Sequence, residues 1–287
     1  MKRIVYLLAF CLLTACYQEV DLHVPFEGSK MVLEGYVSPG KGLDLKIKKS
    51  FDPYEYTEFG EDGYWVNGAR TYIYQAGQLI DSCRELGDGR YLSMHPEYYS
   101  AGGEYEVRIN APGLGAVYVE DIRIPEETLV DTNAFTFRMH ESMYSLTLTV
   151  SFINPDHYVN YIGRSWHDSH TDNPLETWIV MDEHIIEECE GDLIFVSNKC
   201  ETGPFEAVFS STLKKRTKPG STDREFLPKS YVYFEVGQVD ARFRDYVESA
   251  TASDEPFIEP KLNPGNVDGG YGYIVGWNPV GFTYKLK

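Results

Sequence analysis

The most regular stretch of the sequence is YSLTLTVSF at residues 144–152. An apolar side chain occupies every second position from Tyr144 to Phe152, and a serine or threonine fills each position between them. A period of two places alternate side chains on opposite faces, so one face is buried and the other meets water. The stretch therefore predicts a half-buried β-strand, and it sets the pattern for reading the rest of the chain.

Short segments with strand character recur upstream of this stretch. Ala76-Gly77 separates two of them and predicts a hairpin turn. About seven such segments within about a hundred residues, divided by turn residues, are typical of an immunoglobulin-like sandwich. The expected strands are residues 31–37, 43–47, 70–75, 78–83, 89–92, 105–109 and 117–124. We expect residues 30–125 to form an immunoglobulin-like β-sandwich.

Downstream of Pro125 the sequence predicts a second antiparallel β domain, residues 126–287. One helix is expected near residues 241–250, because Asp240 is a good N-cap and an apolar face follows it. We expect this helix to pack on the second sheet. Further strands are expected at residues 158–166, 176–181, 193–196, 205–209 and 231–236, with a last one after residue 273. The predicted fold class is therefore mainly β, with one short helix.

The N-terminus carries the parts of a bacterial secretory signal. Lys2 and Arg3 precede an uncharged run at residues 4–13, which is shorter than the roughly twenty apolar residues that a membrane-spanning helix needs. The order Leu13-Thr14-Ala15-Cys16 resembles a lipobox, which implies acylation of Cys16, for example with palmitate, and cleavage just before it. Several acyl chains anchor a protein stably. We expect a signal peptide at residues 1–15 and a tether at residues 16–29.

Charge and cysteine usage narrow the function further. A formal net charge of −18 argues against binding to nucleic acid or adsorption to anionic lipid, and it favours solubility. Cys189 and Cys200 flank a strand-like run, and a hairpin there would bring them together, so we predict a disulfide. Cys83 is left over, and we expect it to be buried and inert.

Several ordered motifs resemble those of one protein family. They are the opening strand at residues 30–37, the segment at residues 68–73, the turns at residues 89–91 and 102–105, and the C-terminal set at residues 244–246, 255–260 and 266–272. In these the chain resembles the DUF4249 family of Bacteroidota outer-membrane lipoproteins. The resemblance covers nearly the whole mature chain. It implies a place at the outer membrane, beside TonB-dependent transporters, and it carries over no catalytic or binding residue.

In that family's phylum, acidic residues after the lipidated cysteine favour export to the cell surface. Here only Glu19 and Asp21 stand in residues 17–21. We therefore expect the protein to face the surface, and a periplasmic orientation stays open.

Two polar segments contain residue types that bind metal ions. The run WHDSH at residues 166–170 holds two histidines three apart, but no His-Glu-x-x-His motif or third ligand accompanies them. The acidic run at residues 182–192 lacks the spacing of a calcium loop. Both fit solvated loops, and no Gly-x-Ser-x-Gly elbow occurs. We expect no metal, no cofactor and no enzymatic activity, although a hydrolase within the second domain stays a minor alternative.

An aromatic, acidic loop at residues 51–64 offers a candidate binding surface. Tyr54, Tyr56, Tyr64 and Trp65 could grip a sugar, a peptide or a protein partner, or they could tuck onto the second domain. The expected function is a non-enzymatic accessory or ligand-binding partner of a TonB-dependent transporter. The alternative is a free-standing surface adhesin or glycan-binding module.

Overall fold

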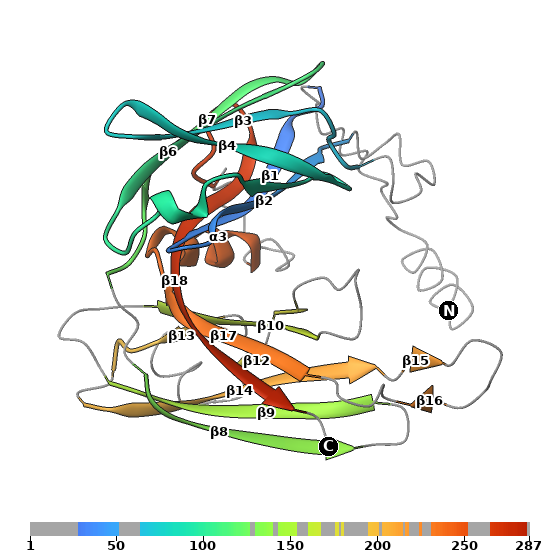
Figure 1. Cartoon of the computed structure of the whole chain (residues 1–287), viewed down its shortest axis with the longest axis vertical. Coiled ribbons are helices and arrows are strands. Elements are labelled where there is room, and N and C mark those ends of the chain that lie inside the picture. The colour runs from blue at the N-terminus through green and yellow to red at the C-terminus, as the bar shows by residue number, and fades with distance from the viewer. Residues whose placement is uncertain are drawn as a thin grey trace, which may run out of the picture.

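The computed structural model describes residues 28–51, 64–126, 130–139, 143–153, 160–167, 176–177, 179–180, 195–200, 203–214, 216–217, 224–225, 231–251 and 265–285. Within these ranges the chain is mainly β, with one α-helix, and the elements fall into two groups joined by a long strand (Figure 1). The elements of the first group are β1 (Met31–Ser38), β2 (Gly42–Lys49), β3 (Arg70–Gln75), β4 (Gln78–Gly87), β5 (Arg90–Ser93), the 3-10 turn η2 (Pro96–Tyr98), β6 (Glu104–Ala111) and β7 (Gly115–Arg123).

The elements that follow are β8 (Val130–Met139), β9 (Met143–Phe152), β10 (Asn160–His167), β11 (Glu176–Thr177), β12 (Ile179–Val180), β13 (Phe195–Ser197), β14 (Phe205–Lys214), β15 (Arg216–Thr217), β16 (Arg224–Glu225), β17 (Tyr231–Val239), α3 (Arg242–Thr251) and β18 (Tyr271–Lys285). No helix in the described part of the chain has the length and apolar character that crossing a membrane requires.

The first group is a two-layer sandwich. One layer has the order β1-β2-β5 and the other the order β4-β3-β6-β7, and β4 pairs with both β3 and β5 where the chain passes between the layers. The core between them collects the alternate apolar residues of each strand, for example Leu43, Leu45 and Ile47 of β2, all fully buried. Burying apolar area at roughly 25 cal/mol per Å² is what holds such layers together.

A tyrosine fixes the corner between β5 and β6. The buried Tyr105 hydroxyl accepts a hydrogen bond from the Ser100 amide at 2.9 Å and donates to the Tyr98 carbonyl at 3.4 Å. This is the tyrosine corner of immunoglobulin-like sandwiches, in which a tyrosine early in the sixth strand bonds back to the preceding loop. Strand order and tyrosine corner together confirm the predicted immunoglobulin-like sandwich.

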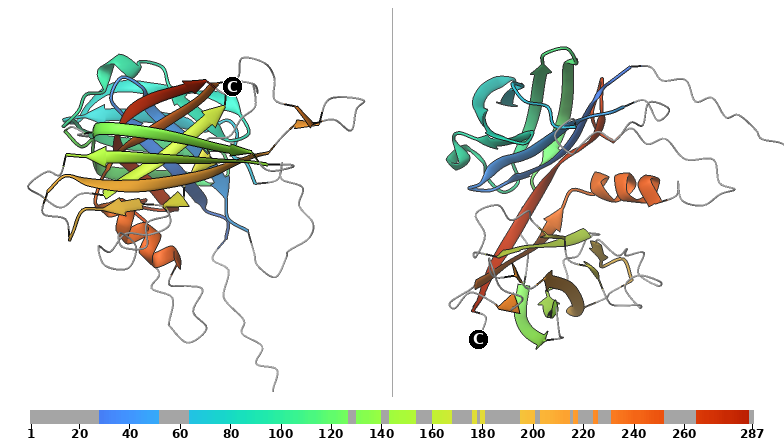
Figure 2. Two further views of the ribbon diagram at one scale, coloured as in Figure 1. Left: turned by 90° about the horizontal axis from the view of Figure 1, so that it is seen from below. Right: turned by 90° about the vertical axis from the view of Figure 1, so that its right-hand side faces the viewer.

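The last strand, β18, joins the sandwich to the rest of the molecule. Residues 271–276 pair in parallel with β1, and residues 277–285 pair antiparallel with β17. β18 therefore extends the first layer of the sandwich into a second sheet that continues through β17 and β10. Figure 2 shows β18 in dark red running obliquely through both groups of strands.

The second group is built around aromatic side chains. A sheet of order β12-β14-β9-β8 faces the β10-β17-β18 sheet. The rings of Phe152 and Tyr161 lie 4.4 Å apart, and those of Phe209 and Phe234 lie 5.8 Å apart, so each pair joins one sheet to the other. The predicted stretch at residues 144–152 is all of β9 except its first residue, and Leu148, Val150 and Phe152 are buried as the alternation requires.

The predicted fold class is confirmed. Beyond it, the structure adds β8, which pairs along β9 and was not predicted. The helix near residues 241–250 is α3, and it packs on the β1–β18 junction as well as on the second sheet. The predicted domain division between residues 125 and 126 stays a prediction; residues 271–276, from beyond it, complete the first layer of the sandwich.

Candidate functional site

An aromatic–arginine cluster lies where β1, β10, β18 and α3 meet. We use this name for Tyr36, Arg164, Phe243, Tyr246, Tyr273 and Trp277. Alternation along β18 creates it: Ile274 points into the sandwich core, whereas Tyr273, Val275 and Trp277 point to the opposite face. Tyr36 joins that face from β1, because its neighbours Gly35 and Val37 are the buried ones.

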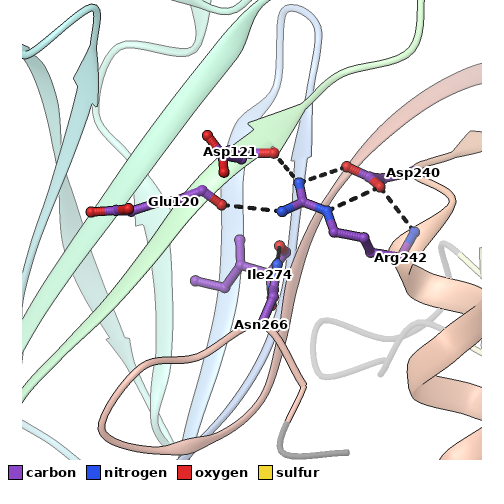
Figure 3. A network of polar contacts seen from close by, with 6 residues as sticks. All are labelled: Glu120, Asp121, Asp240, Arg242, Asn266 and Ile274. Atoms are coloured by element: carbon purple, nitrogen blue, oxygen red, sulfur yellow. Dashed lines mark hydrogen bonds and ion pairs between the residues drawn. The ribbon is translucent and has the colours of Figure 1, made fainter.

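The helix that covers this face is anchored at its first turn. Asp240 is the N-cap, and its Oδ1 accepts a hydrogen bond from the Arg242 amide at 3.0 Å. The Arg242 guanidinium donates to Oδ2 of Asp240 at 2.9 Å and also reaches across to the backbone carbonyls of Glu120 and Asp121 on β7 (Figure 3). The predicted cap is therefore present, and it also ties α3 to the sandwich.

The two carbonyls are available because β7 contains a β-bulge. Tyr105 pairs with Ile122 and Val107 with Val119, so Glu120 and Asp121 together face a single residue of β6. Asp121 adopts a φ of 56°, in the left-handed region, which turns the backbone out of the ladder. Arg242 satisfies carbonyls that the bulge has released.

Asn266 fixes β18 beside this contact. Its side-chain amide donates to the Ile274 carbonyl at 2.7 Å, and its Oδ1 accepts from the Ile274 amide at 3.0 Å (Figure 3). The side chain thus takes the place of a neighbouring strand at this point. Buried backbone groups need such partners, so the part of β18 that carries Tyr273 and Val275 is held in place on both sides.

The rings of the cluster are in direct contact. The Tyr36 and Tyr273 hydroxyls are 2.9 Å apart and their rings 5.7 Å apart. Phe243 lies 5.2 Å from Tyr273, and Tyr246 lies 4.6 Å from it. Edge and tilted arrangements of this kind are the favourable ones for aromatic pairs. The result is a rigid wall of rings supplied by two strands and the helix.

Arg164 lies on these rings. Its guanidinium is 4.4 Å from the Tyr36 ring centroid and 5.5 Å from that of Trp277. A stacked guanidinium keeps its N–H donors at the edge, available to an acceptor. Burial raises the pKa of Tyr36, although the nearby Arg164 opposes this, and burial also raises the pKa of Tyr273. Both hydroxyls therefore stay protonated, and one of the two hydrogens is not used within the pair.

The predicted aromatic binding surface is only partly described. Tyr54 and Tyr56 lie outside the described residues. Tyr64 and Trp65 are half-buried against the edge of β2: the Tyr64 ring lies 5.4 Å from Phe51, and Lys48 lies 5.6 Å from the Trp65 ring. The structure places neither residue in the aromatic–arginine cluster, and their role in binding stays a prediction.

The cysteine predictions have a mixed outcome. Cys16 and Cys189 lie outside the described residues. Cys200 is disulfide-bonded, and its pairing with Cys189 stays a prediction. Cys83 is half-buried and in the thiol form, and burial together with the charge of Asp81 raises its pKa to about 12.

The two polar segments that contain metal-binding residue types lie almost entirely outside the described residues. Trp166 and His167 are the last residues of β10, and His170 and the acidic run at residues 182–192 lie outside the described residues. Among the residues that the structure does describe, no three histidine, cysteine or acidic side chains converge as metal ligands would.

Sequence reasoning missed the cluster because its members are far apart. Tyr36 and Tyr273 are 237 positions apart, and Arg164 stands in an ordinary strand sequence. The one available signal was the apolar helix face, which includes Phe243 and Tyr246, together with the aromatic residues 271, 273 and 277 at every second or fourth position of the last strand.

The comparison with family models identifies the chain. A model described as "Domain of unknown function (DUF4249)" matches residues 17–281. The chain belongs to the DUF4249 family. This confirms the family that the sequence motifs indicated, whereas the lipoprotein nature and the outer-membrane location stay predictions. The match includes every residue of the aromatic–arginine cluster. No functionally curated protein matches this DUF4249 chain.

Two solved structures are similar to this DUF4249 protein at low scores. The FN1–FN3 domains of chicken CNTN1 match at 11% identity and a TM-score of 0.23, covering 92% of this chain and 70% of theirs. A DUF3823 family protein from Parabacteroides merdae matches at 13% identity and a TM-score of 0.18, covering 73% of this chain and 90% of its own. With scores this low neither function transfers, and the fold assignment rests on strand order and the tyrosine corner.

Proposed function

We propose that the protein is a lipid-anchored outer-membrane protein, acylated on Cys16, that serves as a non-enzymatic, ligand-binding accessory of a TonB-dependent transporter. Membership of the DUF4249 family and the lipobox-like Leu13-Thr14-Ala15-Cys16 support the location. The same family resemblance is the reason for proposing a TonB-dependent transporter as the partner.

The observation that carries the ligand-binding part is the aromatic–arginine cluster. It joins a wall of rings to a half-buried guanidinium, a combination that suits recognition of a small molecule. Its titratable members are three tyrosines, whose pKa values burial raises, and an arginine. These groups do not form a general acid–base pair that titrates near neutral pH. The cluster therefore favours binding over catalysis.

The experiment is an affinity pull-down of the full chain from mildly solubilised outer membranes, with mass spectrometry of the proteins that accompany it. We expect a TonB-dependent transporter at matching stoichiometry. A chain that comes down alone would contradict the accessory role and favour a free-standing adhesin or glycan-binding module.

A matched control separates the anchor from the partner. Cys16→Ser removes the acylated thiol and leaves every described residue unchanged. Metabolic labelling with a palmitate analogue should label the wild-type chain and not this variant. Equal labelling of the two would rule out Cys16 as the acylated residue.

A further inference from the structure

The face that carries the cluster also carries a row of charged residues. Three carboxylates on this face each form an ion pair with a different basic side chain. The pairs are Glu34 with Lys48 at 3.0 Å, Asp44 with Arg90 at 2.9 and 3.1 Å, and Glu235 with Lys41. Cross-strand pairs of opposite charge are the normal way in which a sheet face satisfies its charges.

Two bases on this face remain without a carboxylate. Within the described residues, neither Lys46 nor Arg164 forms an ion pair. An acidic residue does lie close to each of these bases. Glu34 is directly opposite Lys46 in the β1–β2 register, but its carboxylate forms an ion pair with Lys48. Likewise Glu235 lies opposite Arg164, but it bonds to Lys41. Among the described residues of this face the three acids are occupied, and two positive charges stay unmatched, in a chain of net charge −18.

The two unmatched bases act on one another. Burial lowers the pKa of Lys46, Glu34 opposes that shift, and Arg164 adds to it. Like charges in a half-buried setting are unfavourable unless an anion lies close to both. The structure therefore holds a position where an added negative charge would be stabilised from two sides.

A third unsatisfied group belongs to the same cluster. Trp277 is only 3% exposed, and its indole Nε1 has no hydrogen-bond partner within the described structure. A buried donor that forms no hydrogen bond lowers the stability of the folded protein by about 1–3 kcal/mol. Arg164 stacks on this same ring, so an unused N–H donor and an unmatched cation occur side by side.

We propose that the aromatic–arginine cluster is a binding site for a carboxylate attached to an aromatic or apolar body. Arg164 holds the carboxylate with its planar fork, and Lys46 supplies the second positive charge. The half-buried rings of Tyr36 and Tyr273 contact the apolar body, and the unused Trp277 N–H lies beside Arg164. A single negative charge fits better than a phosphate dianion, because Glu34 and Glu235 line the same face. The proposal deepens the ligand-binding part of the proposed function and rests on it.

The experiment is a calorimetric titration of the full-length chain in a non-ionic detergent, with phenylacetate as the probe. Phenylacetamide has the same shape without the charge, and inorganic phosphate has the charge without the ring. We expect phenylacetate to bind, and either control compound to bind at least about tenfold more weakly. Equal binding of phenylacetamide, or no binding of phenylacetate at millimolar concentration, would overturn the proposal.

Variants locate the site. Arg164→Met keeps the length of the side chain and removes its charge, and it should weaken phenylacetate binding at least about tenfold. Trp277→Phe keeps an aromatic ring, although a smaller one, and removes the N–H, and it should weaken binding several-fold. The matched control is Arg108→Met. Arg108 also lies over a tyrosine, 4.3 Å from the Tyr74 ring, but it belongs to β6 in the other layer of the sandwich and is paired with Glu106. Its binding should equal that of the wild type.

A second variant keeps the proposal testable if the first one does not fold. If Arg164→Met does not fold, as judged by circular dichroism, Lys46→Met takes its place, since Lys46 is half-exposed on β2. Undiminished binding by a folded variant of either residue would overturn the proposal. The titration needs no transporter, so the two proposals can fail separately. If phenylacetate does not bind but the pull-down still recovers a transporter, only this site is disproved. If phenylacetate binds but the pull-down recovers no transporter, only the accessory role is disproved.

Discussion

At position 83 a thiol lies half-buried on β4, beside a buried carboxylate. Asp81 is only 4% exposed, and its carboxylate accepts hydrogen bonds from the Ser82 amide at 2.7 Å, the His95 amide at 3.2 Å and the Tyr99 hydroxyl at 3.0 Å. These bonds tie the loop after β5 to β4. They also hold a negative charge where it opposes ionisation of Cys83.

We predict that Cys83 resists alkylation in the folded protein. A thiol whose pKa is raised to about 12 is almost entirely protonated at pH 8, with on the order of a thousandfold less thiolate than an exposed cysteine. Treatment with iodoacetamide at pH 8, followed by peptide mapping, should leave Cys83 unmodified in the native chain and modified in urea. Rapid labelling of the native chain would mean that the thiol is not in this environment.

At the level of single elements, α3 depends on its first turn. Asp240 caps the helix and pairs with Arg242, and Arg242 in turn reaches the bulge of β7. Loss of the cap should therefore loosen the helix and its attachment to the sandwich together.

We predict that Asp240→Ala destabilises the protein by about 1–2 kcal/mol, the cost of a lost N-cap together with the weakened Arg242 contact. Hydrogen exchange of the Arg242 and Phe243 amides should accelerate in this variant. Asp240→Asn keeps a capping oxygen and should stay much closer to the wild type. An equal effect of the two substitutions would show that charge, and not capping, is what α3 needs.

The elements were largely predictable from sequence, whereas their association was not. Alternation identified β9, and Ala76-Gly77 identified the β3–β4 turn, because both signals are local. The helix followed from Asp240 and the spacing of its apolar residues. By contrast, the pairing of β1 with β18 is decided by tertiary packing between distant segments, which leaves no local pattern.

The candidate site was hidden for a related reason. In the sequence Lys46 stands among alternating charges and looks like any solvent-facing lysine of a strand. Only the register of β1, β2 and β17 reveals that Glu34 and Glu235 are bonded elsewhere. The aromatic loop, which the sequence made conspicuous, contributes no residue to the aromatic–arginine cluster in its described part.

For the whole molecule, β18 is the common element of both groups of strands. It approaches β1 so closely at Gly272 that an added Cβ would lie 1.9 Å from the Leu33 carbonyl oxygen, and Gly272 has a φ of +94°. Only glycine fits such a position without strain. Further along, Gly281 has space, since the nearest atoms to an added Cβ belong to Glu235 at 3.8 and 3.9 Å.

We predict that Gly272→Ala lowers the stability of the entire molecule, whereas Gly281→Ala has little effect. The left-handed backbone alone costs an alanine roughly 1–2 kcal/mol, and the clash adds to it, so the thermal midpoint should fall by about 5 °C or more. Because both sheets share β18, tyrosine and tryptophan signals should report one common transition. Two separate transitions, or equal effects of the two substitutions, would contradict a shared central strand.

The parallel pairing of β1 with β18 also bears on the order in which the chain folds. β1 can complete its pairing only with residues 271–276, which lie far along the chain from it. Contacts between such distant segments form slowly. We expect the first sandwich to keep an open edge along β1 until β18 docks. Docking of β18 is then a late step of folding, and it closes the sandwich and joins it to the second sheet at once.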